Sequence, residues 1–563
     1  MTSLGTQLLQ SEDGSQTATI LPVAATSLPI VHKNYLNTQV AIARLPPEIL
    51  AQVFLHCIVP VAIGGYACPP SHKWLKVSHV CHFWREVALG TPGLWTHIHV
   101  RGLATTLECA NAFLDRSRQS MLTLRVDFVA WKLSPVIHAL IRSMVRADNL
   151  HLYLPITTMK EIGRLLPHFA PHLRSLYLGI DCDLYRGDES YDTSQFLRAC
   201  SAPALQELKI SNVHFEGLKG TLPFTLKHLS IYNPGRGPSE SLSVLLGILQ
   251  GLCSLESLAI SSDMYSALPS IPSSSIHMPH LKFLRVDTST EECVHLLALL
   301  VIPASTIVSV SSRTRVQDDD GILLASVLVD KLMACVQHIC RENMTAKLVL
   351  SRTHLRVFQT DRSDHEARSV ESWQSPQFDV AFIGPNGNIP CSWFADVCTL
   401  ASPLDVGILF ISDGRLLDCS PTLSPEHNSA WHEVLRSMPN LFFLGINNRV
   451  MSGRIKDDHA VLELIRPYRS SSPDDIGATS TSEFRIPVPK LEHLLLQDVT
   501  FKAAKSSRGP RFVDELMDVF QQRKEAGCEL KQIIIRKCVN VEKRNVKKLR
   551  KVVAVAWDEV DEQ

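Results

Sequence analysis

Two stretches near the N-terminus, RLPPEILAQVFLHC at residues 44–57 and WLKVSHVCHFWREVALGTPGLWTHI at residues 74–98, decide how the first part of the chain folds. The first stretch predicts a short helix, because its apolar residues recur at helical spacing. The second predicts another helix, which ends at Gly90, Pro92 and Gly93. A unit of about 50 residues buries little core by itself, so we expect it to pack on a partner or on the rest of the chain.

Each predicted helix gathers its large apolar side chains on one face. Pro46 and Pro47 suit the start of the first helix, where a missing N–H costs nothing. Glu48 falls in its first turn, where the helix dipole favours a negative charge. The predicted apolar faces are Leu45, Ile49, Leu50, Val53, Phe54 and Cys57 in the first helix, and Val77, Val80, Cys81, Trp84 and Ala88 in the second.

The pattern resembles the F-box, with LPPEIL at residues 45–50 and V-C-x-x-W-R-x-x-A-x-x-T-P-x-L-W at residues 80–95. One departure is a long Pro/Gly-rich loop at residues 59–73. The resemblance implies docking on a Skp-type adaptor and, through it, on a cullin–RING ubiquitin ligase. It implies these residues as adaptor contacts or supports of the contact: Leu45, Pro46, Ile49, Leu50, Phe54, Val80, Trp84 and Trp95. The alternative is a helical hairpin packed on its own chain.

Composition excludes several classes of protein. The 563 residues contain 56 Lys plus Arg and 56 Asp plus Glu, a balance that argues against a general binder of nucleic acid or anionic membrane. No apolar run approaches the ~18 residues of a membrane span, and the N-terminus lacks the pattern of a signal peptide. The 15 cysteines are scattered without C-x-x-C, which is typical of reduced thiols. We therefore expect a cytoplasmic or nuclear protein, or one present in both compartments.

A short pattern, L-x-x-L-x followed by Leu, Ile or Val, returns along the rest of the chain. It starts at Leu173, Leu205, Leu226, Leu255, Leu281, Leu441 and Leu491, with a variant at Leu530. Helix-like segments, such as residues 241–252 and 291–300, lie between the predicted strands. Strands that alternate with helices at this spacing predict a leucine-rich-repeat solenoid. Between residues 300 and 440 the pattern degrades to apolar strands at 305–310, 378–383 and 403–412, so the repeats cannot be counted there.

The fold class is therefore α/β, with a small helical F-box followed by an irregular solenoid that has a curved parallel sheet and outer helices. The predicted organisation is a flexible segment at 1–40, the F-box at 41–100, the repeat domain at 101–555 and an acidic tail at 556–563. The basic stretch before this tail predicts a solvated helix with Val541, Val546, Leu549 and Val553 inward; nuclear import is the alternative.

The sequence contains no motif of an enzyme. The G-x-x-x-x-G-K-[ST], H-E-x-x-H and G-x-S-x-G patterns are absent. Two pairs of histidines, His79 with His82 and His97 with His99, could in principle bind a metal, but we interpret them as exposed or half-buried residues of a contact surface. We therefore expect no catalysis, no cofactor and no metal.

Two functions remain open: a substrate receptor of a ubiquitin ligase, and a repeat scaffold that uses its F-box outside protein degradation. As a receptor, the chain would bind a target protein on the open face of the sheet. Alternation along the strands predicts these outward positions: Tyr177, Lys209, Tyr232, Phe283, Arg285, Phe443, Leu495 and Ile534. Among them we expect Tyr177, Tyr232, Phe283, Arg285 and Phe443 to contact the target, whose identity the sequence does not give. The alternative is that polar inserts or the chain's own ends cover these positions.

Overall fold

The computed structural model divides the chain into two compact units. The first contains residues up to Thr96 together with Asp115–Arg118, and the second contains His97–Leu114 and the chain from Gln119 onward. Each unit is described by itself. The structure describes residues 40–58, 61–63, 66–68, 72–101, 106–127, 135–166, 170–181, 196–198, 200–212, 218–232, 242–261, 275–313, 327, 331, 345–350, 354–360, 376, 378–383, 406–412, 434–447, 462, 464–469, 484–499, 501 and 512–558.

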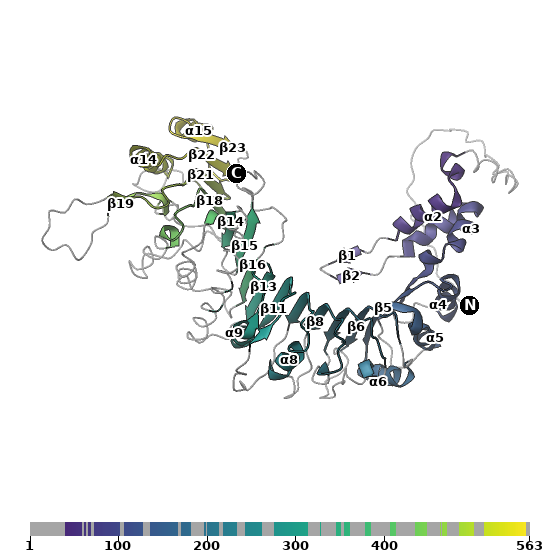
Figure 1. Ribbon diagram of the computed structural model, residues 1–563. Coiled ribbons are helices and arrows are strands. Elements are labelled where there is room, and N and C mark those ends of the chain that lie inside the picture. Colours follow the sequence, from purple (N-terminus) through teal and green to yellow (C-terminus); the bar gives the residue numbers. More distant parts are fainter. Residues whose placement is uncertain are drawn as a thin grey trace, which may run out of the picture. The chain divides into compact units, whose positions relative to one another are not determined.

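The first unit is a small helical domain that includes a short antiparallel hairpin (Figure 1). Its elements are η1 (Ala41–Arg44), α2 (Pro47–His56), β1 (Val61–Ile63), β2 (Tyr66–Cys68), η2 (His72–His79), α3 (His82–Gly90) and η3 (Pro92–Trp95). The prediction of one second helix with a single apolar face is wrong. Because Cys81 adopts an extended backbone, the chain breaks between η2 and α3.

Aromatic residues form the core of the first unit. The rings of Phe54 and Trp84 lie 5.1 Å apart, and those of Trp74 and Trp95 meet edge-on at 4.9 Å. The indole N–H of Trp95 donates a 2.9 Å hydrogen bond to the carbonyl of Ala88. A buried Trp side chain needs a hydrogen-bond acceptor for its N–H, and Ala88 on α3 supplies one. The segment after α3 therefore folds back onto this helix and closes the small core.

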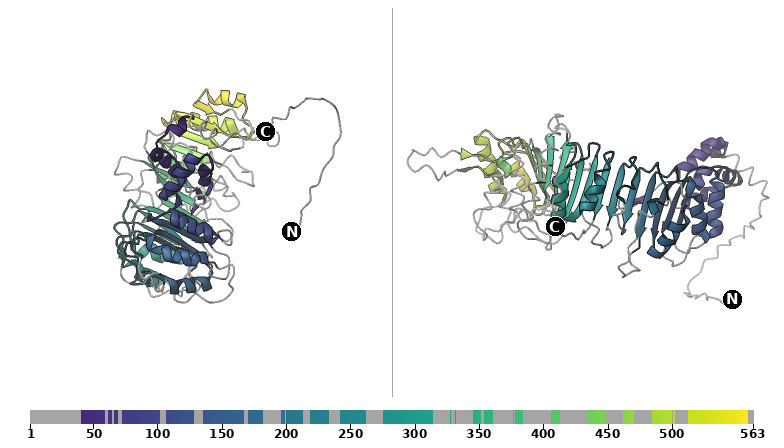
Figure 2. Two further views of the ribbon diagram at one scale, coloured as in Figure 1. Left: turned by 90° about the vertical axis from the view of Figure 1, so that its right-hand side faces the viewer. Right: turned by 60° about the horizontal axis from the view of Figure 1, so that its bottom comes forward.

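The second unit is built around a long sheet with helices on its outer side (Figures 1 and 2). Strand registers connect, in this order, β3 (His97–Arg101), β4 (Leu122–Asp127), β5 (Ala147–Leu154), β6 (Ser175–Ile180), β7 (Glu207–Ser211), β8 (His228–Tyr232), β9 (Ser257–Ser261), β11 (Phe283–Ser289), β13 (Ile307–Arg313), β16 (Phe378–Ile383), β15 (His354–Thr360), β14 (Thr345–Leu350), β17 (Val406–Ile411), β18 (Phe443–Asn447), β21 (His493–Gln497), β22 (Gln532–Arg536) and β23 (Ala554–Trp557).

The strands of this sheet run parallel, except that β15 is antiparallel to both of its neighbours. β16 therefore pairs with β13 although β14 and β15 lie between them in sequence. The helices of the unit are α4 (Leu107–Arg116), α5 (Pro135–Ser143), η4 (Met144–Arg146), α6 (Ile156–Leu165), α8 (Leu242–Leu249), α9 (Thr290–Leu299), α14 (Phe512–Glu525) and α15 (Lys543–Leu549). Two short pairs complete it: β10 (Ile276–His277) with β12 (Leu300–Val301), and β19 (Tyr468–Arg469) with β20 (Phe484–Arg485).

The predicted fold class is confirmed. The repeat leucines, such as Leu208, Leu229 and Leu258, are buried together with the Leu, Ile or Val two positions later. The strands predicted at 305–310, 378–383 and 403–412 coincide with β13, β16 and β17. The sequence did not predict β3, β4 or β5, nor the pair β14 and β15.

The boundary between the two units can be compared with the predicted domain boundaries. Contacts divide the chain between Thr96 and His97, because β3 already belongs to the sheet. Of the predicted flexible segment 1–40 only Val40 is described, and of the predicted tail 556–563 only residues 556–558, of which two still belong to β23. Within the described part, no helix combines the length and the hydropathy needed to cross a bilayer.

Candidate functional site

The predicted adaptor residues fall into three groups by exposure. Pro46, Ile49 and Val80 are exposed; Leu45 and Trp84 are half-buried; Leu50, Phe54 and Trp95 are buried. The buried three hold the small domain together, so any contribution they make to a contact is indirect. The assignment of these residues to an adaptor contact remains a prediction.

Helix α2 has two apolar faces rather than the predicted single face. Leu50 and Phe54 point into the core of the unit. Ile49 and Val53, also four residues apart, are 50% and 41% exposed, and Val80 after η2 is 59% exposed. Apolar side chains in such a pair lie together on a helix surface. A small domain that leaves large aliphatic side chains in solvent is suited to docking on a partner.

The open face of the sheet in the second unit is polar at its N-terminal end. This face lies opposite the buried leucines. One row of aligned residues runs across it from β3 to β11: His99, Arg125, His151, Tyr177, Lys209, Ser230, Ala259 and Arg285.

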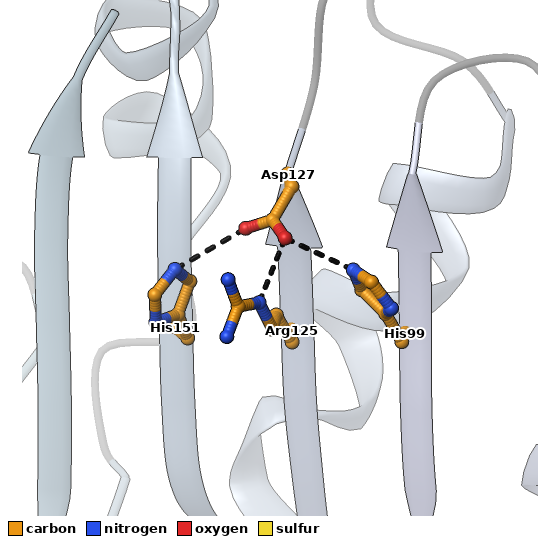
Figure 3. Close-up of polar contacts among 4 residues, drawn as sticks. All are labelled: His99, Arg125, Asp127 and His151. Carbon is orange, nitrogen blue, oxygen red and sulfur yellow. Dashed lines mark hydrogen bonds and ion pairs between the residues drawn. The ribbon is translucent and has the colours of Figure 1, made fainter. Parts of the chain in front are cut away.

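Four residues of β3, β4 and β5 form a hydrogen-bonded cluster around one carboxylate (Figure 3). The Nε2 atom of His99 lies 3.0 Å from Asp127 Oδ2, and Arg125 Nε donates to the same oxygen at 2.7 Å. His151 Nε2 lies 3.2 Å from the other carboxylate oxygen, Oδ1. Each side chain is about one quarter exposed or less, so the cluster is partly shielded from water.

The surroundings shift the pKa values of this cluster. Burial by itself raises the pKa of the Asp127 carboxyl, but hydrogen bonds from His151, His99 and Arg125 outweigh it and hold that pKa well below its usual range. Burial lowers the pKa of His151, against the opposing hydrogen bond to Asp127. At neutral pH the cluster therefore contains an ionised Asp127 and a His151 that favours its neutral form.

An aromatic stack extends the cluster toward β6. The imidazole of His151 and the ring of Tyr177 are parallel within 7°, with centroids 4.0 Å apart. Gly179 makes room for the tyrosines: a Cβ atom there would lie 2.7 Å from Tyr153 and 2.9 Å from Tyr177. Strands β4 to β6 thus present a preorganised polar and aromatic surface.

This cluster has the residue types of a two-histidine, one-carboxylate metal site, but not the arrangement. Arg125 already occupies the carboxylate, and a guanidinium repels a cation. Among the described residues no group of three or more His, Cys, Asp or Glu side chains is placed to hold a metal ion.

The predicted target-contact residues do not share one environment. Tyr177 and Tyr232 are half-buried, whereas Phe283 is 49% exposed and Arg285 is exposed. The expectation that Phe443 lies on an open surface is wrong, since it is 0% exposed. Leu495, another predicted outward position, is also buried, so the expectation that it lies on an open surface is wrong as well.

The burial of Phe443 has a clear physical cause. It belongs to a second apolar cluster on the sheet, formed by Val349, Ile408, Phe410, Phe443 and Leu495. The rings of Phe410 and Phe443 lie 5.3 Å apart, and the Phe410 ring occupies the space above Gly445, where a side chain would clash. Alternation along the strand predicted the direction of these side chains correctly, but not the neighbours that cover them.

Comparison with known proteins supports the first unit most directly. Residues 42–101 match the sequence model of the F-box-like family, so the chain carries an F-box-like domain. Among curated proteins no match to the chain is found. An LRR protein of Leptospira interrogans is a structural neighbour at 12% identity; the alignment covers 83% of this chain and 91% of that protein, with a TM-score of 0.28.

Proposed function

We propose that this chain is a substrate-recognition subunit of a Skp–cullin–F-box ubiquitin ligase. The observation that carries the proposal is the exposed aliphatic pair Ile49 and Val53 within a domain that matches the F-box-like family. In this role the chain catalyses nothing. It holds a target near the ubiquitin-transfer machinery and raises the effective concentration of the target's lysines.

The adaptor contact is tested by copurification of a Skp-type adaptor with the full chain. Ile49→Asp combined with Val53→Asp places two charges on the exposed apolar face of α2 and leaves the buried Leu50 and Phe54 intact. Truncating interface anchors of this kind costs ~2 kcal/mol or more, so adaptor recovery is expected to be lost. The matched control is Gln52→Asp with His56→Asp, an exposed pair at the same spacing on the same helix. Equal recovery by both double variants contradicts the adaptor assignment.

The target contact is assigned to the open sheet face between β4 and β11. Its supports are the exposed Phe283 and Arg285, and the half-buried Tyr177 and Tyr232 on the same face. The test is an affinity purification with the proteasome blocked. Changing Tyr232, Phe283 and Arg285 to Ser is expected to remove target proteins from the eluate while the adaptor stays. Recovery of the same targets at full yield places recognition elsewhere.

A further inference from the structure

A hollow of about 680 Å³ lies at the C-terminal end of the repeats. Its lining includes residues that directly follow α15 and residues of β23, two elements labelled in Figure 1. It is lined by the cations Lys524, Lys531, Arg550 and Lys551, by the carboxylate Glu529, and by the mainly apolar residues Leu530 and 552–555. All four cations and Glu529 are exposed to solvent. Positive charge and apolar surface therefore meet in one depression.

The fold of the basic tail segment explains why cations gather here. Val541, Val546, Leu549 and Val553 are buried, which confirms the predicted inward face of this segment. The basic residues between them must then point outward. The charge of Lys548 is paired, since its Nζ atom lies 2.7 Å from Asp514 on α14.

Internal ion pairs leave the hollow with excess positive charge. Lys524 Nζ lies 3.7 Å from the carboxylate of Glu529, and Lys531 Nζ lies 2.7 Å from Glu492, which is not part of the lining. Arg550 and Lys551 form no ion pair with any residue that the structure describes. Since the whole chain has no formal net charge, this excess is local.

We infer that the hollow binds a short acidic segment of a partner protein, in which carboxylates flank an aliphatic side chain. The carboxylates match the cations on the rim, and the aliphatic side chain matches the half-buried Val552 and Val555 in the lining. The hollow uses none of the residues assigned to the adaptor or to the target, so it does not depend on the proposed function.

One observation favours an acidic protein segment over a single-stranded nucleic acid. No aromatic side chain lines the hollow, whereas surfaces that bind single strands stack bases on aromatic rings.

The test uses the full chain and a synthetic fluorescein-labelled peptide, Glu-Val-Asp-Glu-Leu-Glu, in a fluorescence-anisotropy titration at two salt concentrations. The expected result is saturable binding that weakens with salt. Arg550→Glu with Lys551→Glu is expected to weaken binding by about tenfold or more, because reversed charges face the carboxylates. The matched control is Lys543→Glu with Arg544→Glu, the same charge change on exposed residues of α15 outside the lining.

Five outcomes overturn the inference. The first four are no binding of the acidic peptide, equal weakening by the control pair, equal binding of the amide counterpart Gln-Val-Asn-Gln-Leu-Gln, and tighter binding of a fluorescein-labelled single-stranded oligonucleotide. The fifth comes from a variant that ends at Asp558 and so lacks Glu559, Asp561 and Glu562. If only this variant binds the peptide, the occupant is the chain's own tail, and the assignment to a partner protein is wrong.

Discussion

The Nε2 atom of His99 lies 3.0 Å from the carboxylate of Asp127, across two neighbouring strands and 28 residues of sequence. The contact exists because the register of β3 and β4 places His99 beside Arg125 and brings Asp127 within reach. His151 completes the set from β5. Three strands that the leucine pattern does not mark therefore build a hydrogen-bonded polar cluster on the open face of the sheet.

Removing this carboxylate is expected to destabilise the N-terminal repeats. Asp127→Asn should cost about 1–3 kcal/mol, since hydrogen bonds to a charged group are lost and Arg125 loses its counterion. The measurement is the urea midpoint of the full chain, followed by hydrogen exchange in β3 to β5. The matched control is Asp115→Asn, a carboxylate outside the sheet. Unchanged exchange in β3 to β5 contradicts the structural role of the cluster.

The contribution of Asp127 should also depend on pH. Its pKa in the folded chain is held below the ~3.9 of an unfolded aspartate, so the carboxylate stabilises the fold above that value. The contribution is lost as pH falls through the folded-state pKa. The difference in unfolding free energy between the wild type and Asp127→Asn is thus expected to narrow from about pH 5 to pH 3. A difference that widens over this interval contradicts the lowered pKa.

The register of the repeats is tested at Leu208 and Leu258. Both are buried between the sheet and the outer side of the repeat, so each change to Ala should cost on the order of 2–5 kcal/mol. The damage is expected to spread to adjacent repeats, because each repeat is stabilised by its neighbours. Hydrogen exchange measures this spread, and Ser257→Ala, at a half-buried position of the open face, is the control. If neither Leu→Ala change lowers the stability of the chain, the register of the repeats is wrong.

Two phenylalanines of the sheet, Phe443 on β18 and Phe283 on β11, should respond differently to the same substitution. Phe443→Ala opens a cavity in a buried aromatic cluster and is expected to cost about 3–5 kcal/mol. Phe283→Ala removes a ring that is 49% exposed and should change stability by about 0.5 kcal/mol or less. Thermal unfolding of both variants checks this contrast. Equal decreases in Tm contradict the difference in burial between Phe443 and Phe283.

A buried guanidinium links α14 to two distant segments. Arg523 is 0% exposed and donates to the carbonyls of Ile465 at 3.3 Å, Pro487 at 2.9 Å and Val488 at 2.8 Å. Arg523→Met leaves these acceptors unpaired, at a cost of about 1–3 kcal/mol each in desolvation, partly offset by water. The expected result is a lower urea midpoint than that of the control Gln522→Met, an exposed neighbour. Equal urea midpoints of the two variants contradict a stabilising role of the Arg523 hydrogen bonds.

The sequence alone predicted features that depend on the local spacing of residues. It did not predict contacts that depend on how neighbouring strands align. Repeat leucines such as Leu258 were predicted as buried, because their spacing alone sets the face they occupy. The cluster at Asp127 was missed, although HIHVR at residues 97–101 and LTLRVD at 122–127 alternate as strands do. The antiparallel β15 and the burial of Phe443 could not be predicted, because both depend on contacts between segments far apart in sequence.

The first helix shows the same limit at a smaller scale. Spacing placed Ile49, Leu50, Val53 and Phe54 on one apolar face, since all four fall within one wide helical stripe. The fold divides this stripe between the core and solvent, because the small unit can bury only Leu50 and Phe54. The exposed remainder is the part that the proposed function requires.

The most direct test of the proposed function is isothermal titration calorimetry of the purified full chain with a purified Skp-type adaptor. We expect a saturable one-to-one complex with a Kd of about 1 µM or tighter, equivalent to roughly −8 kcal/mol. Ile49→Asp with Val53→Asp should weaken it by at least about thirtyfold, and Gln52→Asp with His56→Asp should leave it unchanged. No heat of binding from the wild-type chain, or equal affinity of the two double variants, would contradict the claim that this chain is an F-box receptor.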